Sequence, residues 1–308
     1  MKSPVSKVNK GFALATGTAV ALLALSVSPG AQENAVAAAS LNLQNECDRL
    51  AGSASDNQRN KAFGAVETSE IAASAIDSCR LAFEATGNPR FAYQLGRALN
   101  KANEIDQAMS AYQAAAQADY PAAKVNFGIL LGRLGDHRAE FEMYREAAQG
   151  GSVLAAYNLG VSYRDGIGTE IDVSKALAWF ETAAAGGDDT AAFNIAVIHD
   201  EGNLVPEDDQ TAIAWYDLAV ARGNVDAMVN LGIMLETGEG IEPDAAQAAE
   251  LYAQAAERGD MFAANKVVEL HASGRLAPPE VSEFDEGVTT LILKEGDMET
   301  PSILTKSI

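Results

Sequence analysis

What decides the fold of this chain is the stretch Ala155-Ala156-Tyr157-Asn158-Leu159-Gly160, because it recurs at a fixed interval. Its later copies are Ala191-Ala192-Phe193-Asn194-Ile195-Ala196 and Ala227-Met228-Val229-Asn230-Leu231-Gly232. Successive copies begin 36 residues apart, from 155 to 191 and from 191 to 227, and a fourth begins at Ala263 and stops early. Such a period indicates a repeat architecture in which each copy is one structural unit.

The second half of each unit repeats in step with the first. Trp179-Phe180 corresponds to Trp215-Tyr216 and to Leu251-Tyr252 at the same interval. Both halves space their apolar residues three and four apart, which is typical of amphipathic helices. A turn that contains glycine separates the halves, as in Gly166-Ile167-Gly168. We therefore predict an all-α fold, an α-solenoid of about five stacked helix hairpins that bury their apolar faces against one another.

These motifs resemble the Sel1-like repeat, a relative of the tetratricopeptide repeat, in its exported bacterial form. The resemblance covers residues 121 to about 275. The copy at 121–152 is a hybrid, because Asn126 and Asn158 are only 32 residues apart and its central loop is shorter by four. Upstream of residue 121, Leu95-Gly96, Ala108, Tyr112 and Ala115 follow the tetratricopeptide spacing.

The resemblance implies a partner-binding groove on the concave face of the first helices. In the tetratricopeptide relatives that groove is lined by the residue two before the Leu-Gly pair and the residue just after it. These positions carry Tyr93, Arg97, Val125, Ile129, Tyr157, Val161, Phe193, Val197, Val229 and Ile233. Each pair is spaced i, i+4 and so shares one helix face. The alternative is that the stripe is packed between helices as core.

The N-terminus predicts export. Lys2, Lys7 and Lys10 precede an uncharged apolar run, Phe12 to Val27, and residues 35–37 read Ala-Val-Ala. This is the pattern of a secretory signal peptide, with a cut after Ala31, Ala37 or Ala39. We expect residues 1–37 to be the signal peptide, 38–86 a helical N-terminal cap, 87–276 the repeat array and 277–308 an acidic, flexible tail. The mature chain is then expected in the periplasm or outside the cell, without membrane insertion.

The two cysteines, Cys47 and Cys79, are expected to form one disulfide. Thiols in exported proteins tend to oxidise, and two cysteines allow a single pairing. The run from Ile71 to Phe83 predicts a helix that carries Cys79. A bond to Cys47 would attach an earlier helix to it and complete a disulfide-bonded cap.

The charge and the absence of known motifs argue against nucleic-acid binding, catalysis and cofactor binding. A formal net charge of −21 disfavours nucleic-acid partners. Neither a metal-binding H-E-x-x-H, a G-x-S-x-G elbow nor a phosphate-binding glycine loop occurs, so we expect no cofactor, metal or catalytic residue. His199 and His271, 72 residues apart, are expected at core positions of first helices.

These observations favour a non-enzymatic protein-protein interaction scaffold or regulator of the cell envelope, which binds a protein or peptide. A peptidoglycan- or carbohydrate-binding module is the alternative. A cell-wall hydrolase is a further alternative, because 43 acidic residues allow many chance carboxylate pairs. The oligomeric state does not follow from the sequence.

Overall fold

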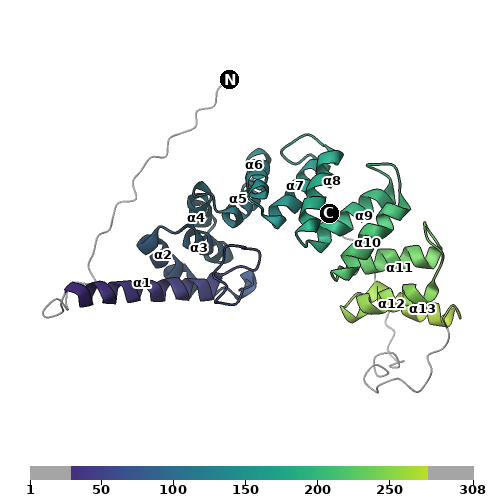
Figure 1. The fold of residues 1–308 in the computed structure, drawn as a ribbon, viewed down its shortest axis with the longest axis horizontal. Coiled ribbons are helices and arrows are strands. Elements are labelled where there is room, and N and C mark those ends of the chain that lie inside the picture. The colour runs from purple at the N-terminus through teal and green to yellow at the C-terminus, as the bar shows by residue number, and fades with distance from the viewer. Residues whose placement is uncertain (1–28, 277–308) are drawn as a thin grey trace, which may run out of the picture. The chain divides into compact units, whose positions relative to one another are not determined.

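The computed structural model describes residues 29–276, with side chains from Glu33 onward. The charged start and apolar run of the predicted signal peptide, and the predicted acidic tail at 277–308, lie outside the described residues. Figure 1 shows that helices make up most of the described residues, and no strand occurs among them. The all-α prediction is confirmed.

Thirteen α-helices and one short 3-10 helix follow one another along the chain. Most are 13 residues long, so each makes between three and four turns. In order they are α1 (Pro29–Ala51), η1 (Thr68–Glu70), α2 (Ser74–Thr86), α3 (Pro89–Lys101), α4 (Ile105–Gln117), α5 (Pro121–Arg133), α6 (His137–Gln149), α7 (Val153–Asp165), α8 (Val173–Ala185), α9 (Asp189–Glu201), α10 (Asp209–Ala221), α11 (Val225–Thr237), α12 (Ala245–Glu257) and α13 (Met261–Ala272).

Pairs of helices form the predicted hairpins: α3 with α4, α5 with α6, α7 with α8, α9 with α10 and α11 with α12. Only residues 134–136 separate α5 from α6, whereas residues 166–172 separate α7 from α8. The shortened loop of the hybrid copy is therefore confirmed. α13 is the first helix of a fourth copy and has no second helix within the described range.

The described chain divides into two compact units. The first, unit 1, runs to Ala155 and includes Ile167–Thr169; the second, unit 2, comprises Ala156–Gly166 and the chain from Glu170 onward. The boundary falls within α7, inside the predicted array. The predicted division at residue 86, between cap and array, is a boundary of another kind and stays a prediction.

Within a hairpin, a glycine of the first helix lies against an aromatic ring of the second. A Cβ atom added to Gly160 would lie 2.6 Å from Phe180 Cδ1, and one on Gly96 would lie 2.5 Å from Tyr112 Cδ1. Such distances are shorter than a van der Waals contact, so glycine permits the close approach of the two helices. The Leu-Gly pair of the repeat is therefore a packing motif. Phe180 and Tyr112 are buried behind it.

Aspartates begin many of the helices. Side-chain oxygens of N-terminal residues accept hydrogen bonds from backbone N–H groups of the first turn, as Asp188 Oδ1 does from Ala191 N at 2.7 Å. Such caps satisfy N–H groups that lack a partner within the helix. The aspartates in this position are Asp136, Asp172, Asp188, Asp208, Asp244 and Asp260. Part of the acidic excess therefore stabilises the repeats.

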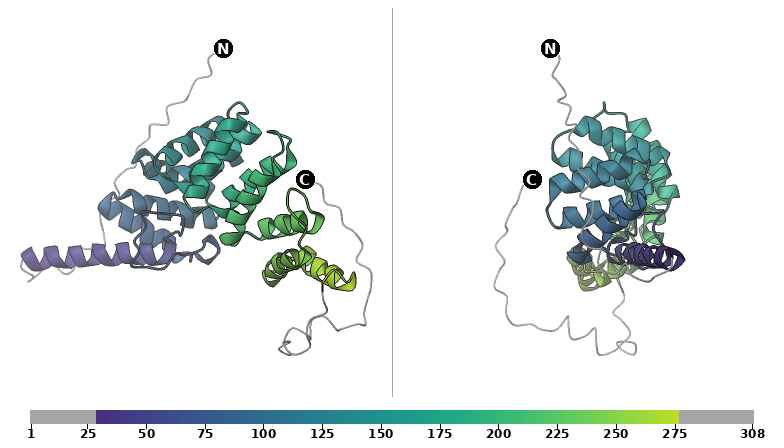
Figure 2. Two further views of the ribbon diagram at one scale, coloured as in Figure 1. Left: turned by 45° about the vertical axis from the view of Figure 1, so that its right-hand side comes forward. Right: turned by 90° about the vertical axis from the view of Figure 1, so that its left-hand side faces the viewer.

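The predicted disulfide joins α1 to α2. The Sγ atoms of Cys47 and Cys79 are 2.07 Å apart, and both residues are fully buried. The helix that carries Cys79 begins at Ser74 rather than at Ile71. Figure 2 shows α1 running beside the helices of unit 1, with its N-terminal part extending beyond them. Residues 33–39 of that part are all exposed.

None of the described helices combines the length and the apolar character that a membrane-crossing segment needs.

Candidate functional site

The predicted groove positions lie on two first-helix faces, one in each unit. We call the surface around Tyr93, Arg97, Val125 and Ile129 the unit 1 face. The surface around Tyr157, Val161, Phe193, Val197, Val229 and Ile233 is the unit 2 face. The two faces differ in burial: Tyr93, Arg97 and Val125 are buried, whereas all six positions of the unit 2 face are half-buried. Ile129 is exposed.

In unit 1 the chain itself contacts part of this face, around Tyr93 and Arg97. Residues 52–70 form an irregular segment between α1 and α2, which we call the cap segment. Arg97 on α3 donates from Nη1 to the backbone oxygen of Ala51 at 2.6 Å and from Nη2 to that of Val66 at 2.8 Å. The guanidinium of Arg97 therefore binds a backbone carbonyl of the cap segment, that of Val66, and the last carbonyl of α1, that of Ala51. Tyr93, four residues earlier, is buried, and burial raises the pKa of its hydroxyl above the ordinary value.

A second hydrogen bond connects the cap segment to the residue just before α5. The hydroxyl of Tyr120, just before α5, donates to Asp56 Oδ2 at 2.7 Å, and Asp56 is only 2% exposed. Burial raises the pKa of Asp56 above its ordinary value, although the hydrogen bond from Tyr120 acts in the opposite direction. Burial also raises the pKa of Tyr120, and the nearby carboxylate adds to the shift. The phenol therefore stays protonated and remains a donor.

Asp48, at the end of α1, forms the third buried polar centre of unit 1. Its carboxylate accepts hydrogen bonds from Asn60 Nδ2 at 2.9 Å, from Arg90 Nη2 at 3.0 Å and from Gln94 Nε2 at 3.0 Å. A buried carboxylate is tolerated when several donors surround it. These bonds connect α1, the cap segment and α3.

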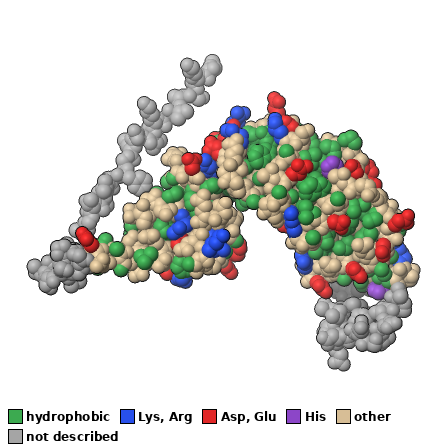
Figure 3. Space-filling view, in the orientation of Figure 1, with side chains coloured by type: hydrophobic (Ala, Val, Ile, Leu, Met, Phe, Trp, Pro, Cys, Tyr) green, Lys and Arg blue, Asp and Glu red, His purple; other side chains and the backbone are tan. Residues whose placement is uncertain are grey.

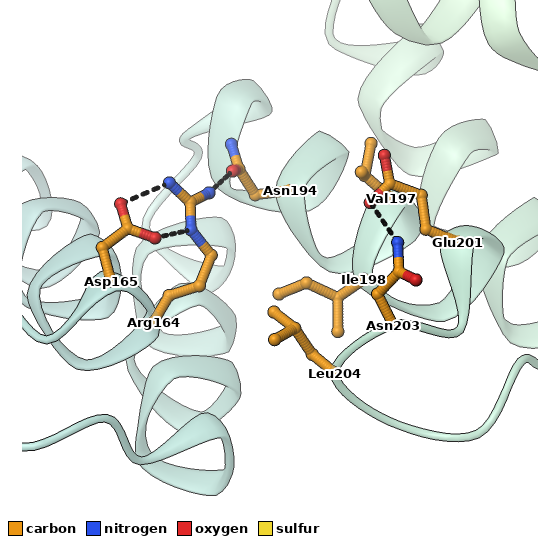
Figure 4. Close-up of a pocket in the computed structure, with 8 residues that line it drawn as sticks. All are labelled: Arg164, Asp165, Asn194, Val197, Ile198, Glu201, Asn203 and Leu204. Carbon is orange, nitrogen blue, oxygen red and sulfur yellow. Dashed lines mark hydrogen bonds and ion pairs between the residues drawn. The ribbon is translucent and has the colours of Figure 1, made fainter.

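The unit 2 face carries an open pocket of about 450 Å³ between α7 and α9, shown in Figure 4. Val197, a predicted groove residue, lines it together with Ile198 and Leu204. Arg164 and Asn194 lie on the opposite side, joined by a hydrogen bond of 2.6 Å from Nη1 to Oδ1. The pocket therefore has an apolar wall and a polar wall.

Two of the predicted groove residues of unit 2 also pack within their own hairpins. The ring of Tyr157 lies 5.8 Å from that of Phe180, and the ring of Phe193 lies 6.0 Å from that of Tyr216. Both residues keep part of their surface exposed. Tyr157 and Phe193 therefore pack within their hairpins and also form part of the unit 2 face. At these positions core packing and an accessible surface occur together.

Three of the four repeated asparagines connect neighbouring hairpins. Asn230 Nδ2 on α11 donates to the hydroxyl of Tyr216 on α10 at 3.0 Å, and Asn126 on α5 makes the same contact with Tyr112 on α4 at 3.4 Å. Asn194 instead accepts from Arg164. Together with the glycine-aromatic contacts within hairpins, these bonds fix the stacking that forms each face.

The histidine prediction was wrong for His271, which is exposed, and His199 is only half-buried. The incomplete last copy explains the difference, because no second helix covers α13 within residues 29–276. No cluster of histidine, cysteine and carboxylate side chains in that range is arranged to hold a metal ion.

This architecture defines the class of the protein: an α-solenoid of tetratricopeptide-like helix hairpins. The model of the Sel1 repeat matches residues 153–188, 190–224 and 225–260. The chain therefore contains three Sel1 repeats, and the predicted resemblance is confirmed. The hybrid copy at 121–152 lies outside the matched residues.

Solved structures give the same result. The chain is similar to a Sel1 repeat protein from Oxalobacter formigenes, with 26% identity over 65% of this chain and 86% of the other, and a TM-score of 0.58. It is also similar in fold to c5321, a protective antigen present in uropathogenic Escherichia coli strains, with 23% identity and a TM-score of 0.65. That match covers 81% of this chain but about half, 52%, of the antigen. A search of curated proteins finds no significant match.

Proposed function

We propose that this chain is a non-enzymatic scaffold that acts outside the cytoplasm, in the periplasm or after secretion, and binds a peptide segment of a partner protein on its unit 2 face. Sel1 and tetratricopeptide-like repeats commonly serve protein-protein interaction, and Sel1 repeat proteins are generally non-enzymatic. The fold thus supplies the general class of activity.

The observation that carries the proposal is the cap segment on the unit 1 face. There a first helix binds an irregular stretch of polypeptide through its backbone carbonyls, with Arg97 as the donor. A backbone-directed contact of this kind does not depend on one particular sequence. The corresponding helix positions of unit 2 are partly exposed, and one of them, Val197, lines an open pocket. They offer a partner the kind of face that unit 1 fills with its own chain.

A peptide-binding experiment tests this function. Random linear peptides displayed on phage are selected against the oxidised protein, and the selected peptides are measured by fluorescence anisotropy. We expect Val197→Arg to weaken binding by at least about tenfold, because a bulkier, charged side chain enters the apolar wall of the pocket. Ile171→Arg is the matched control, since Ile171 is an exposed apolar residue of unit 2 outside the pocket.

Two results would contradict the proposal. In one, the selected peptides bind the Val197→Arg and Ile171→Arg variants equally well. In the other, no peptide is selected while purified peptidoglycan retains the protein, which favours the glycan-binding alternative.

Export is part of the proposal and has its own test. The buried cysteine pair is oxidised, as is usual outside the cytoplasm. Removal of residues 1–37 would take away no buried side chain from the described part of α1, because residues 33–39 are exposed. We expect N-terminal sequencing of protein from its native cell to begin between Gln32 and Ser40. Recovery of chains that begin at Met1 from the cytoplasm would refute export.

A further inference from the structure

The pocket of the unit 2 face is acidic on balance. Its apolar wall is formed by Val197, Ile198 and Leu204, and its charged residues are Arg164, Asp165 and Glu201. Two carboxylates against one guanidinium leave one negative charge. Figure 3 shows carboxylates scattered among hydrophobic side chains over the helices of unit 2.

The guanidinium of Arg164 is already engaged. Its Nε and Nη2 atoms donate to the two oxygens of Asp165 at 2.7 and 2.8 Å, and Nη1 donates to Asn194. The pair is bidentate, the strong form of an arginine-carboxylate contact. The hydrogen bond from Arg164 lowers the pKa of Asp165, which keeps this carboxylate charged. Arg164 and Asp165 therefore form a neutral polar wall, and Arg164 is not available as a free anion-binding group.

Glu201 carries the charge that remains. It is exposed at the end of α9, and the contact shown in Figure 4 is a long hydrogen bond of 3.4 Å from Asn203 Nδ2. Val197 lies one helical turn before Glu201, so the apolar wall and the carboxylate are neighbours on the same face of α9. Lysine and arginine side chains have the matching composition, an alkyl stem that ends in a cation.

We infer that this pocket binds a lysine or arginine side chain of the partner peptide, with the stem against Val197 and Leu204 and the cation at Glu201. The inference rests on the proposed function and adds a sequence preference to it. A bound basic residue would neutralise the pocket, whereas an acidic residue would meet Glu201 with like charge.

Methyl NMR with two small probes tests the pocket without a peptide. The probes are Nα-acetyl-lysine methylamide and Nα-acetyl-norleucine methylamide, which share an unbranched alkyl stem but differ in charge. We expect the lysine probe to shift the methyl signals of Val197 and Leu204 and to bind about three- to fivefold more tightly than the norleucine probe, as befits a partly exposed ion pair. Glu201→Gln should abolish this difference.

Glu257→Gln is the control, because Glu257 is an exposed carboxylate of unit 2 outside the pocket and its loss changes the net charge equally. This variant should keep the preference. Equal binding of the two probes, or the absence of shifts at both methyl positions, would overturn the inference. Peptides selected on phage then separate the two claims. If peptides are selected but lysine and arginine are not enriched in them, only the pocket preference is refuted. If the lysine probe binds in the pocket but no peptide is selected, only the proposed function is refuted.

Discussion

Replacing Arg97 by methionine will detach the cap segment from the unit 1 face. Arg97 is 5% exposed, and its guanidinium donates to the backbone oxygens of Ala51 and Val66. A hydrogen bond to a charged group contributes about 1.5–3 kcal/mol, and methionine leaves both carbonyl oxygens without this donor. Because the lost charge also removes a desolvation cost, we expect the free energy of unfolding of unit 1 to fall by about 2–4 kcal/mol.

Hydrogen exchange followed by mass spectrometry measures this effect locally. The amide of Val66 donates to the backbone oxygen of Gly52 at 2.7 Å, so it reports whether the segment keeps its folded form. In the Arg97→Met variant, amides of residues 52–70 should exchange faster, while those of α9–α12 in unit 2 should be unchanged. Faster exchange spread evenly over both units would contradict a local role.

Arg133→Met is the matched control for Arg97→Met. Arg133 is an exposed residue at the end of α5, in the same unit, and it makes no hydrogen bond or ion pair within residues 29–276. Its replacement removes the same charge and adds the same side chain. We expect no measurable change in the exchange of the cap segment, so an equal effect of the two substitutions would refute the contact as the cause.

The hairpins could be predicted because apolar periodicity reports burial. Phe180 and Tyr216 are 36 residues apart, and both are fully buried against the first helices of their hairpins. When the same kind of residue recurs at one position of successive units, the same packing contact is expected in each unit. The helix lengths and the short loop before α6 follow from the same alignment.

The cap segment could not be predicted in this way, because its contacts are polar and distant along the chain. Asp56 bonds to Tyr120, 64 residues later, and neither lies in a repeating pattern. One signal was present in the sequence: Arg97 occupies a position that carries Val161, Val197 and Ile233 in the later units. A charge at an otherwise apolar position indicates a local partner, and the partner is the backbone of the segment.

The burial of the predicted groove positions could not be predicted, for a related reason. Helix spacing shows which residues share a face, but it does not show what covers that face. Tyr93 and Val125 share the spacing of Phe193 and Val229, yet the first two are buried and the other two are half-buried. The difference arises from an irregular segment and from neighbouring hairpins, which a pattern of period 36 does not describe.

Breaking the Cys47–Cys79 disulfide will destabilise unit 1 without affecting unit 2. The bond closes a loop of sequence separation 32 that contains the whole cap segment. In the chain-entropy account, a cross-link of this length stabilises the fold by about 3–4 kcal/mol, because it limits the unfolded ensemble. We expect the Cys47→Ala, Cys79→Ala double variant to lose this amount, measured by hydrogen exchange of α2 and α3 in increasing urea. Alanine is the suitable replacement since both positions are fully buried and apolar.

The reductant dithiothreitol provides the control and a second expectation. Both cysteines have an exposure of 0%, so a reductant reaches the bond only when this part of unit 1 opens. Reduction of the native protein should therefore be slow, and it should accelerate in the Arg97→Met variant, in which the cap segment is released. The double variant should not respond to dithiothreitol at all. Equal stability of oxidised and reduced protein would mean that the contacts of Asp48, Asp56 and Arg97 hold the segment without the covalent bond.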